Sequence, residues 1–256
     1  MRAARPILKL DGVSKAFGGI SAVNRLSLTL AVGERRAIIG PNGAGKTTLF
    51  NVITHRYPAD SGRIWFKGRA IERLPPFRIW RLGISRTFQI TSVFPRLSCL
   101  ENVQVGCLSH ARRTLNLVAA AAGMAKDAAS ALLESVGLVD QAGQMASMLS
   151  HGDRKRLELA VSLAGEPELL LLDEPTAGMA PKERLALMDL VLGLAEERGL
   201  TLLFTEHDMD VVFTVARTIT VMHQGSVLAE GSPQDVRRNP QVRNVYLGWQ
   251  AAGEKD

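Results

Sequence analysis

The sequence predicts an α/β fold: a parallel sheet with a phosphate-binding loop, an antiparallel β layer and an inserted α-helical subdomain. Three observations support this prediction. A glycine-rich stretch lies between a short apolar run and an apolar segment, which is the strand–loop–helix order of phosphate-binding loops. A later apolar run ends in two acids, as expected of a strand buried in a parallel sheet. Alanine-rich residues between 119 and 131 favour helix.

Composition limits the classes of protein. The chain has 256 residues, is 46% hydrophobic and carries a net charge of +6, which suits one sizeable α/β domain. No long Lys/Arg run with interleaved aromatics occurs, so nucleic acid is not a predicted partner. Cys99 and Cys107 lack metal-site spacing and are expected to be reduced thiols. No apolar run is long enough to span a bilayer, and no signal peptide is apparent, so a membrane role would come through a partner.

The N-terminal part predicts an antiparallel layer. Apolar and polar residues alternate roughly in residues 7–13 and 26–30, and residues 64–66 form another short strand candidate. Phe17 lies in a glycine-flanked loop between the first two strands. It is a candidate platform for a nucleotide base, because aromatic rings stack on bases. The alternative is an ordinary core phenylalanine.

The central motif follows the apolar run 37–39 and precedes the apolar segment 49–53. Its nine residues are Gly40, Pro41, Asn42, Gly43, Ala44, Gly45, Lys46, Thr47 and Thr48. Glycines permit tight turns that aim backbone N–H groups at phosphate oxygens, and the following helix adds its positive end. Lys46 can reach the β- and γ-phosphates, and the Thr47 hydroxyl can ligate Mg²⁺. The alternative is a chance glycine turn before a helix.

The middle of the chain predicts a helical insertion. Residues 90–164 are expected to form it, within an α/β core of residues 1–89 and 165–256. Gln89 follows a short strand and could ligate a metal or orient water, although a surface glutamine is the default interpretation. Ser150 or Asp153 is suited to cap a long helix over 154–164, and Ser150 with Gly152 makes that helix start a potential anion site.

Acids follow the apolar run 169–172. Asp173 and Glu174 end this strand at the position where open α/β sheets place their sites. Mg²⁺ could compensate their charge, whereas the alternative is a plain helix-capping pair.

The remaining elements are predicted by their boundary residues. Pro181 starts a helix that runs to about Arg198 and stops at Gly199. The next buried strand, 200–204, leads to His207, which is predicted at the same sheet edge as the two acids. This histidine is either structural or in contact with phosphate. Residues 219–229 predict a hairpin, followed by a short helical tail through Tyr246 and Trp249.

In this order, the motifs resemble the ATP-binding subunits of ABC transporters over essentially the whole chain. Within that family, the chain is similar to the ATPases of branched-chain amino acid importers. The urea importers and the lipopolysaccharide-export ATPase are close relatives of that group and remain alternatives. The stretches that carry the likeness are residues 17–23, 83–89, 175–179, 206–212 and 245–248.

The resemblance implies a P-loop NTPase core of the ABC ATPase type that binds ATP and Mg²⁺. Phe17 would stack on adenine, and Lys46 with the backbone of 40–48 would hold the phosphates. Glu174 would act as the general base, and His207 would contact the γ-phosphate. The magnesium ligands would be Thr47, Gln89 and, through water, Asp173.

The resemblance also implies partners. Ser150 and Gly152 would complete the site of a second ATPase subunit, either a sister chain or an identical one. The helical insertion and Gln89 would pass motion to transmembrane permease subunits at the cytoplasmic face of the inner membrane, which indirectly serve a substrate-binding protein. A soluble ABC ATPase of translation or DNA repair is less consistent, because such proteins normally carry two cassettes or a long coiled-coil insert. A nucleotide-binding module without hydrolysis is disfavoured by the acid pair.

Two departures from the family pattern stand out. The signature Leu-Ser-Gly-Gly-Gln appears as Leu-Ser-His-Gly-Asp, with His151 and Asp153 in place of Gly and Gln. We expect Asp153 to point into the helix cap, since an acid near the γ-phosphate would be repulsive. Ala180 stands where the family usually has Asp or Asn, which puts one polar contact between subunits in doubt.

Overall fold

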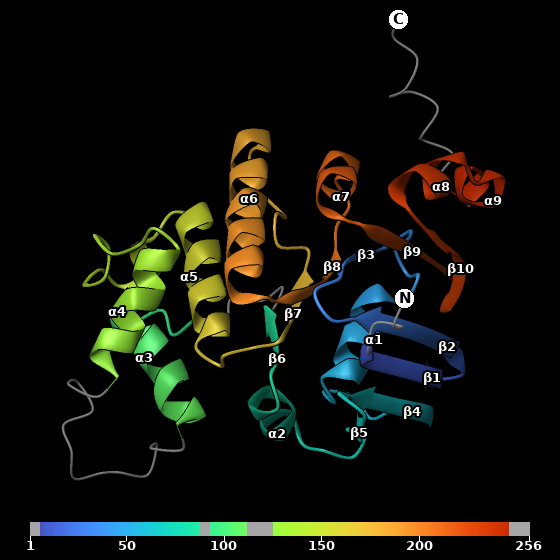
Figure 1. The fold of residues 1–256 in the computed structure, drawn as a ribbon, viewed down its shortest axis with the longest axis horizontal. Coiled ribbons are helices and arrows are strands. Elements are labelled where there is room, and N and C mark those ends of the chain that lie inside the picture. Colours follow the sequence, from blue (N-terminus) through green and yellow to red (C-terminus); the bar gives the residue numbers. More distant parts are fainter. Residues whose placement is uncertain (1–5, 88–92, 112–124, 246–256) are drawn as a thin grey trace, which may run out of the picture. The chain divides into compact units, whose positions relative to one another are not determined.

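The computed structural model describes residues 6–87, 93–111 and 125–245. The described residues fall in two compact units, one within residues 1–76 and 201–256 and the other within residues 77–200. Figure 1 shows their elements along the chain. The second unit contains strands and a long helix besides the helices of the predicted insertion, whose bounds of 90–164 stay a prediction.

The first unit contains an antiparallel sheet in the order β2-β1-β4-β5. Its members are β1 (Pro6–Phe17), β2 (Ile20–Ala31), β4 (Ser61–Phe66) and β5 (Arg69–Ala70). Leu8 pairs with Leu30 and Leu10 with Leu28, and all four are buried. The predicted antiparallel layer is confirmed, and its strands are longer than expected. Gly18 and Gly19 both have positive φ, so a tight turn replaces the expected loop.

A second set of strands in this unit is centred on β3. Strand β3 lies parallel to both β8 and β9, and β10 pairs antiparallel with β9. Residues 37–39 and 202–204 are fully buried, as the apolar runs predicted. The bounds are β3 (Arg35–Ile39), β8 (Thr201–Thr205), β9 (Thr218–His223) and β10 (Ser226–Gly231). The predicted C-terminal hairpin is therefore confirmed.

Short helices complete the first unit. They are α1 (Lys46–Ile53), α7 (Met209–Val215), α8 (Pro233–Arg238) and α9 (Pro240–Val245). Asp208 caps α7 by accepting from Asp210 N at 3.0 Å, and Ser232 caps α8 by accepting from Asp235 N at 3.2 Å. The predicted tail residues Tyr246 and Trp249 lie outside the described residues.

The second unit contains two parallel strands. These are β6 (Ile84–Thr87), which follows α2 (Pro76–Arg81), and β7 (Leu169–Asp173). Thr87 lies opposite Leu172, so both strands end at the same edge. Every residue of β7 is buried, as its continuous apolar run predicted.

The described part of the second unit also contains helices. They are α3 (Cys99–His110), α4 (Lys126–Ser135), α5 (His151–Leu163) and α6 (Pro181–Arg198), with a 3₁₀ turn at Ala146–Met148. Helices α3, α4 and α5 pack against one another (Figure 1, green to yellow). Helix α6 has Pro181 in its first turn and Gly199 as a left-handed C-cap, which confirms both predicted ends. Helix α5 starts three residues earlier than predicted because Ser150 is its cap.

Within the parts of the chain that the structure describes, none of the helices combines the length and apolar character needed to cross a membrane.

Candidate functional site

The glycine-rich loop connects β3 to α1 and is held by backbone contacts within the first unit. A Cβ atom on Gly40 would collide with the Met222 carbonyl oxygen, and one on Gly45 would collide with the Ala22 carbonyl oxygen. Gly225 N donates to the Ala44 carbonyl at 3.1 Å. The loop is therefore packed between β2 and the β9–β10 hairpin, and two of its glycines are required by this packing.

Lys46 lies at the first position of α1 and is only 6% exposed. Its Nζ donates to the carbonyl oxygens of Gly40 at 2.7 Å and Pro41 at 3.2 Å. Helix α1 has no side-chain cap and no acid in its first turn. An ammonium group and the positive end of a helix thus converge on the loop, which is the chemistry that binds phosphate. Thr47 and Thr48 belong to the same first turn and are half-buried.

Phe17 lies at the end of β1 with its side chain 43% exposed, so the core alternative is wrong. Its ring contacts Tyr57 edge-on, with centroids 5.2 Å apart, and Lys15 Nζ lies 5.3 Å from its centroid. An accessible ring beside a cation suits stacking on a base, and the adenine role stays a prediction. Tyr57 was not identified from the sequence, because a single tyrosine in a loop carries no pattern.

His207 follows β8 and is exposed, while its neighbour Glu206 is only 4% exposed. The His207 backbone N–H donates to Glu206 Oε2 at 3.1 Å. The backbone at this position is therefore held by a buried carboxylate, which leaves the imidazole on the surface. Its contact with phosphate stays a prediction.

Asp173 ends β7 in the second unit with its carboxylate fully buried. Arg86 Nη2 donates to Asp173 Oδ2 at 2.7 Å, and the Arg86 side chain is 4% exposed. This pair compensates a charge that would otherwise be costly to bury. Arg86 was not singled out from the sequence, since the two residues are 87 positions apart and only the β6–β7 pairing brings them together.

Glu174 adopts a left-handed backbone conformation with φ of +51°. This conformation costs a non-glycine residue on the order of 1 kcal/mol and is often found at functional sites. A tight turn follows, in which Ala177 N donates to the Glu174 carbonyl at 3.2 Å and Gly178 has φ of +78°. Glu174 is therefore set at the end of a buried strand by a defined turn, with its side chain half-buried.

The predicted cap of α5 is confirmed. Ser150 Oγ accepts from Asp153 N at 3.1 Å and donates to Asp153 Oδ2 at 2.8 Å, so the acid does turn into the cap. His151 Nε2 lies 3.0 Å from the Ala177 carbonyl oxygen. A Cβ on Gly152 would meet only Met179 Cε, at an ordinary 3.6 Å, so packing within this chain does not require that glycine. Ala180 N donates to Glu183 Oε2 at 3.3 Å at the start of α6.

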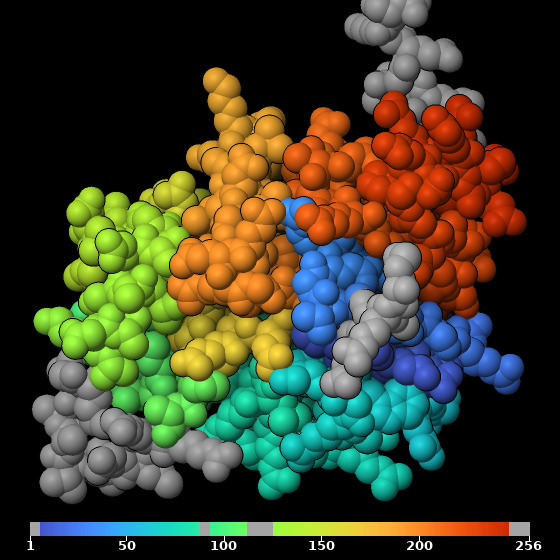
Figure 2. All heavy atoms as spheres, in the orientation of Figure 1, coloured from blue at the N-terminus to red at the C-terminus, as the bar shows by residue number. Residues whose placement is uncertain are grey.

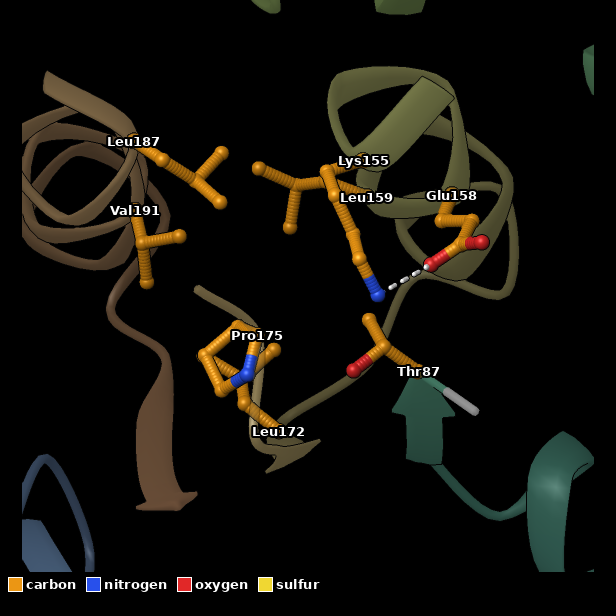
Figure 3. A pocket seen from close by; sticks show the side chains of 8 residues that line it. All are labelled: Thr87, Lys155, Glu158, Leu159, Leu172, Pro175, Leu187 and Val191. Carbon is orange, nitrogen blue, oxygen red and sulfur yellow. Dashed lines mark hydrogen bonds and ion pairs between the residues drawn. The ribbon is translucent and has the colours of Figure 1, made fainter. Parts of the chain in front are cut away.

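A small pocket lies at the ends of β6 and β7 (Figure 3). Lys155 and Glu158 form an ion pair on its α5 side, with Nζ and Oε2 3.5 Å apart. Burial raises the pKa of the Glu158 carboxyl, and Lys155 offsets part of that effect. Thr87 Oγ1 is buried in the pocket wall without a hydrogen-bond partner among the described residues. The apolar lining comes from Leu159, Leu172, Pro175, Leu187 and Val191.

Gln89 falls outside the described residues. Within the described ranges, no cluster of three or more His, Cys, Asp or Glu side chains is arranged to hold a metal ion. The predicted Mg²⁺ ligands are of another kind, namely one hydroxyl, one amide and one carboxylate acting through water. Mg²⁺ commonly combines such oxygen ligands with substrate phosphates. Thr47 fits this role, because its position in the first turn of α1 places it in the phosphate-binding motif.

The glycine-rich loop between β3 and α1, together with the parallel strands β3, β8 and β9, defines a P-loop NTPase core. A family model described as ABC transporter matches residues 23–177, and one described as branched-chain amino acid ATP-binding cassette transporter matches residues 226–248. The chain belongs to the ABC transporter family.

Curated relatives match it over nearly their full length. The chain is 40% identical to the high-affinity branched-chain amino acid transport ATP-binding protein LivG of Salmonella typhimurium, over 96% of this chain and 99% of that one.

Solved structures agree with the fold. The ADP conformation of MJ1267, an ATP-binding cassette of an ABC transporter, is 31% identical with a TM-score of 0.84, covering 95% of this chain and 99% of that one. A dimeric post-hydrolysis structure of the ATP-binding cassette MJ0796, bound to ADP and Pi, is 26% identical with a TM-score of 0.75, covering 88% and 98%. The predicted ABC ATPase fold is therefore confirmed.

Proposed function

We propose that this chain is the ATP-hydrolysing, energy-coupling subunit of an ABC importer for branched-chain or related amino acids. ATP binding closes a dimer of two cassettes, and hydrolysis reopens it. The full-length likeness to LivG and the match of residues 226–248 support the substrate class.

The observation that carries the ATP-binding part is the buried Lys46 at the uncapped start of α1. Its ammonium lies 2.7 Å from the Gly40 carbonyl, inside a loop where a side chain at Gly40 or Gly45 would collide with backbone. A triphosphate supplies the negative charge that this arrangement attracts. Phe17, with its exposed ring, is the proposed adenine platform in the same unit.

Hydrolysis needs a base that accepts a proton from the attacking water. Glu174 is the proposed base: the water oxygen forms a bond to the γ-phosphorus, the bond from that phosphorus to the ADP oxygen breaks, and the carboxylate takes the proton. The left-handed turn at Glu174 supports a functional role. His207 is proposed to contact the γ-phosphate.

Mg²⁺ is the proposed cofactor, held by Thr47, Gln89 and, through water, Asp173. When bound, Mg²⁺ neutralises charge on the β- and γ-phosphates. Arg86 keeps the buried Asp173 carboxylate charge-compensated, with their atoms 2.7 Å apart. Changing Arg86 should therefore disturb Asp173 even though Arg86 touches no nucleotide in this proposal.

A second cassette is the first proposed partner. Ser150 and Gly152 would contact the nucleotide held by that cassette, which is either a copy of this chain or a sister ATPase. The dimeric structure of MJ0796 supports this arrangement by analogy. In this chain Ser150 also donates to Asp153, so the hydroxyl already has a carboxylate neighbour at 2.8 Å.

Permease subunits are the second proposed partner, which would hold this chain at the cytoplasmic face of the membrane and indirectly serve a substrate-binding protein. An exposed apolar group in the second unit supports this. Ser147 N donates to the Pro95 carbonyl at 3.0 Å, which joins the segments that carry exposed Phe94, Met145 and Met148. Figure 2 shows yellow-green atoms of the region around α4 at the surface of the second unit, and the exposed fractions of the three apolar side chains are 53%, 47% and 65%. Exposed apolar groups of this kind often bind protein partners.

The direct test is Glu174→Gln in the full chain, with Glu197→Gln on the exposed side of α6 as the matched control. Glu174→Gln should retain ATP binding and lose about 10²–10⁴-fold in kcat, the range expected for a general base. Light scattering should show an ATP-stabilised dimer for Glu174→Gln. Unchanged turnover in Glu174→Gln would refute the base assignment.

The substrate class needs a separate test. In a reconstituted transporter with its binding protein, leucine should stimulate ATP hydrolysis and urea should not. Stimulation by urea alone would replace the amino acid proposal with the urea importer alternative.

A further inference from the structure

His151 stands where the family pattern has glycine, and its side chain makes a contact that glycine cannot make. Nε2 lies 3.0 Å from the carbonyl oxygen of Ala177, in the loop after Glu174. A carbonyl only accepts hydrogen bonds, so Nε2 carries the proton in this contact. Both residues belong to the second unit.

One end of this contact is fixed by the cap of α5. Ser150 accepts from Asp153 N at 3.1 Å and donates to its carboxylate at 2.8 Å, which sets the backbone direction at the first helical residue. His151 is that residue. The imidazole therefore projects from a defined position rather than from a loose chain end.

The other end is the turn that follows the proposed base. Ala177 N donates to the Glu174 carbonyl at 3.2 Å, while the Ala177 carbonyl faces His151. Gly178 has φ of +78°, and a Cβ there would lie 3.3 Å from His151 Nε2. Glu174 itself has φ of +51°. The turn therefore contains two left-handed residues, Glu174 and Gly178. A hydrogen bond to the Ala177 carbonyl favours this turn over backbone conformations without left-handed residues.

We infer that His151 is a positioning residue, which donates to the Ala177 carbonyl and thereby holds the turn that presents Glu174. This inference rests on the proposed role of Glu174 in hydrolysis. His151 touches neither water nor nucleotide in this scheme. The bond also joins the segment proposed to meet the second cassette's nucleotide to the turn beside this chain's own base.

The test compares His151→Phe, which keeps a ring and removes the donor, with His151→Gln, whose Nε2 amide can donate from a similar reach. His151 is exposed, so both variants should fold. The control is Gln144→Ala. It also removes an exposed hydrogen bond from a side chain to a backbone carbonyl, in this case from Gln144 Nε2 to the Met148 carbonyl.

The first readout is hydrogen exchange in the peptide covering residues 174–180 of the nucleotide-free full chain. His151→Phe should speed exchange of this peptide by roughly threefold or more, while His151→Gln and Gln144→Ala stay at the wild-type rate. Wild-type exchange in His151→Phe would overturn the inference. Equal acceleration in His151→Gln would also overturn it, because a restored donor would then fail to hold the turn.

The second readout is steady-state ATP hydrolysis. His151→Phe should lower kcat by about 5- to 10-fold, the worth of one hydrogen bond, with KM changed less than about twofold, and His151→Gln should recover most of the loss. A change in KM alone would contradict a role at the base. If the wild-type chain does not hydrolyse ATP, the proposed function fails, and the exchange experiment still decides whether His151 holds the turn.

Discussion

Helices α1 and α5 differ at their N-termini, in whether a side chain of the protein caps the first N–H groups and whether an acid lies in the first turn. Helix α1 begins at Lys46 after a left-handed glycine, without a side-chain cap or an acid in its first turn. Helix α5 begins at His151, capped by Ser150 and with Asp153 in its first turn. Helix α1 is therefore arranged to receive an external anion, whereas α5 already contains a carboxylate.

This difference shows that a helix start alone does not define an anion site. The sequence around Ser150 and Gly152 favoured such a site by its small, polar residues. The structure shows Asp153 accepting from the Ser150 hydroxyl at 2.8 Å, which is a local alternative to an external phosphate. The residue three positions into the helix thus decides between a self-contained cap and an open one.

The largest expected effect comes from removing the cation at α1. Lys46→Ala should weaken ATP binding by on the order of 100-fold, since a charge-assisted contact in a buried site is worth about 2–3 kcal/mol. Isothermal titration with ATP would measure this. Lys182→Ala, at the exposed start of α6, is the control and should bind as wild type. Wild-type affinity for ATP in Lys46→Ala would contradict the assignment of the α1 start as the anion-binding one of the two helices.

The next effect tests the packing of the loop. Gly45→Ala should destabilise the chain by about 2 kcal/mol or more, because its Cβ would collide with the Ala22 carbonyl at a φ of +101°. Gly43 also has positive φ, of +80°, but nothing lies within 4 Å of a Cβ there. Gly43→Ala should therefore lower the free energy of unfolding, measured with urea, by only about 1 kcal/mol. Equal destabilisation by Gly45→Ala and Gly43→Ala would show that the approach of Gly45 to the Ala22 carbonyl does not constrain the loop.

A smaller effect concerns the closed helix start. Asp153→Asn removes the charge at the start of α5 and should lower the free energy of unfolding by about 0.5–1 kcal/mol. It should also strengthen the ATP-dependent dimer of the Glu174→Gln chain, because a negative charge would no longer lie at the helix start that is proposed to meet the second nucleotide. Sedimentation of the double variant measures this. A weaker dimer would mean that Asp153 assists the contact instead of opposing it.

The smallest effect is pH-dependent and belongs to the pocket beside α5. The native state holds the Glu158 proton to higher pH than the unfolded chain, since burial raises the pKa of this carboxyl. Stability contributed by this group therefore falls as pH rises from the unfolded pKa through the folded one. Glu158→Gln cannot ionise, so its Tm relative to wild type should increase as pH rises above about 4.3, the ordinary pKa of a glutamate. A pH-independent difference would contradict the assignment.

Features set by local chemistry were predictable from the sequence. The strand–loop–helix order at residues 37–53 and both ends of α6 follow from glycine, proline and apolar periodicity. The turn of Asp153 into the cap of α5 was also expected, because Ser and Asp are residues suited to a helix cap and an acid near a phosphate would be repulsive.

Features that depend on the tertiary fold were not predictable. The Arg86–Asp173 pair joins residues 87 positions apart, and the His151–Ala177 contact joins residues 26 apart through a turn with left-handed residues. The full length of β1 and β2 was missed because exposed polar residues in that hairpin, such as Asn24 and Arg25, obscure the alternation. Backbone pairing and turn geometry decide these contacts, and neither is readable from periodicity.

We expect the open start of α1, and not the closed start of α5, to receive the nucleotide within one chain. Hydrogen exchange of the dilute, monomeric full chain with and without MgATP tests it directly. With MgATP, peptides covering residues 40–54 should exchange more slowly, and exchange in residues 150–157 should stay unchanged. Protection at the start of α5 without protection of the loop after β3 would contradict it.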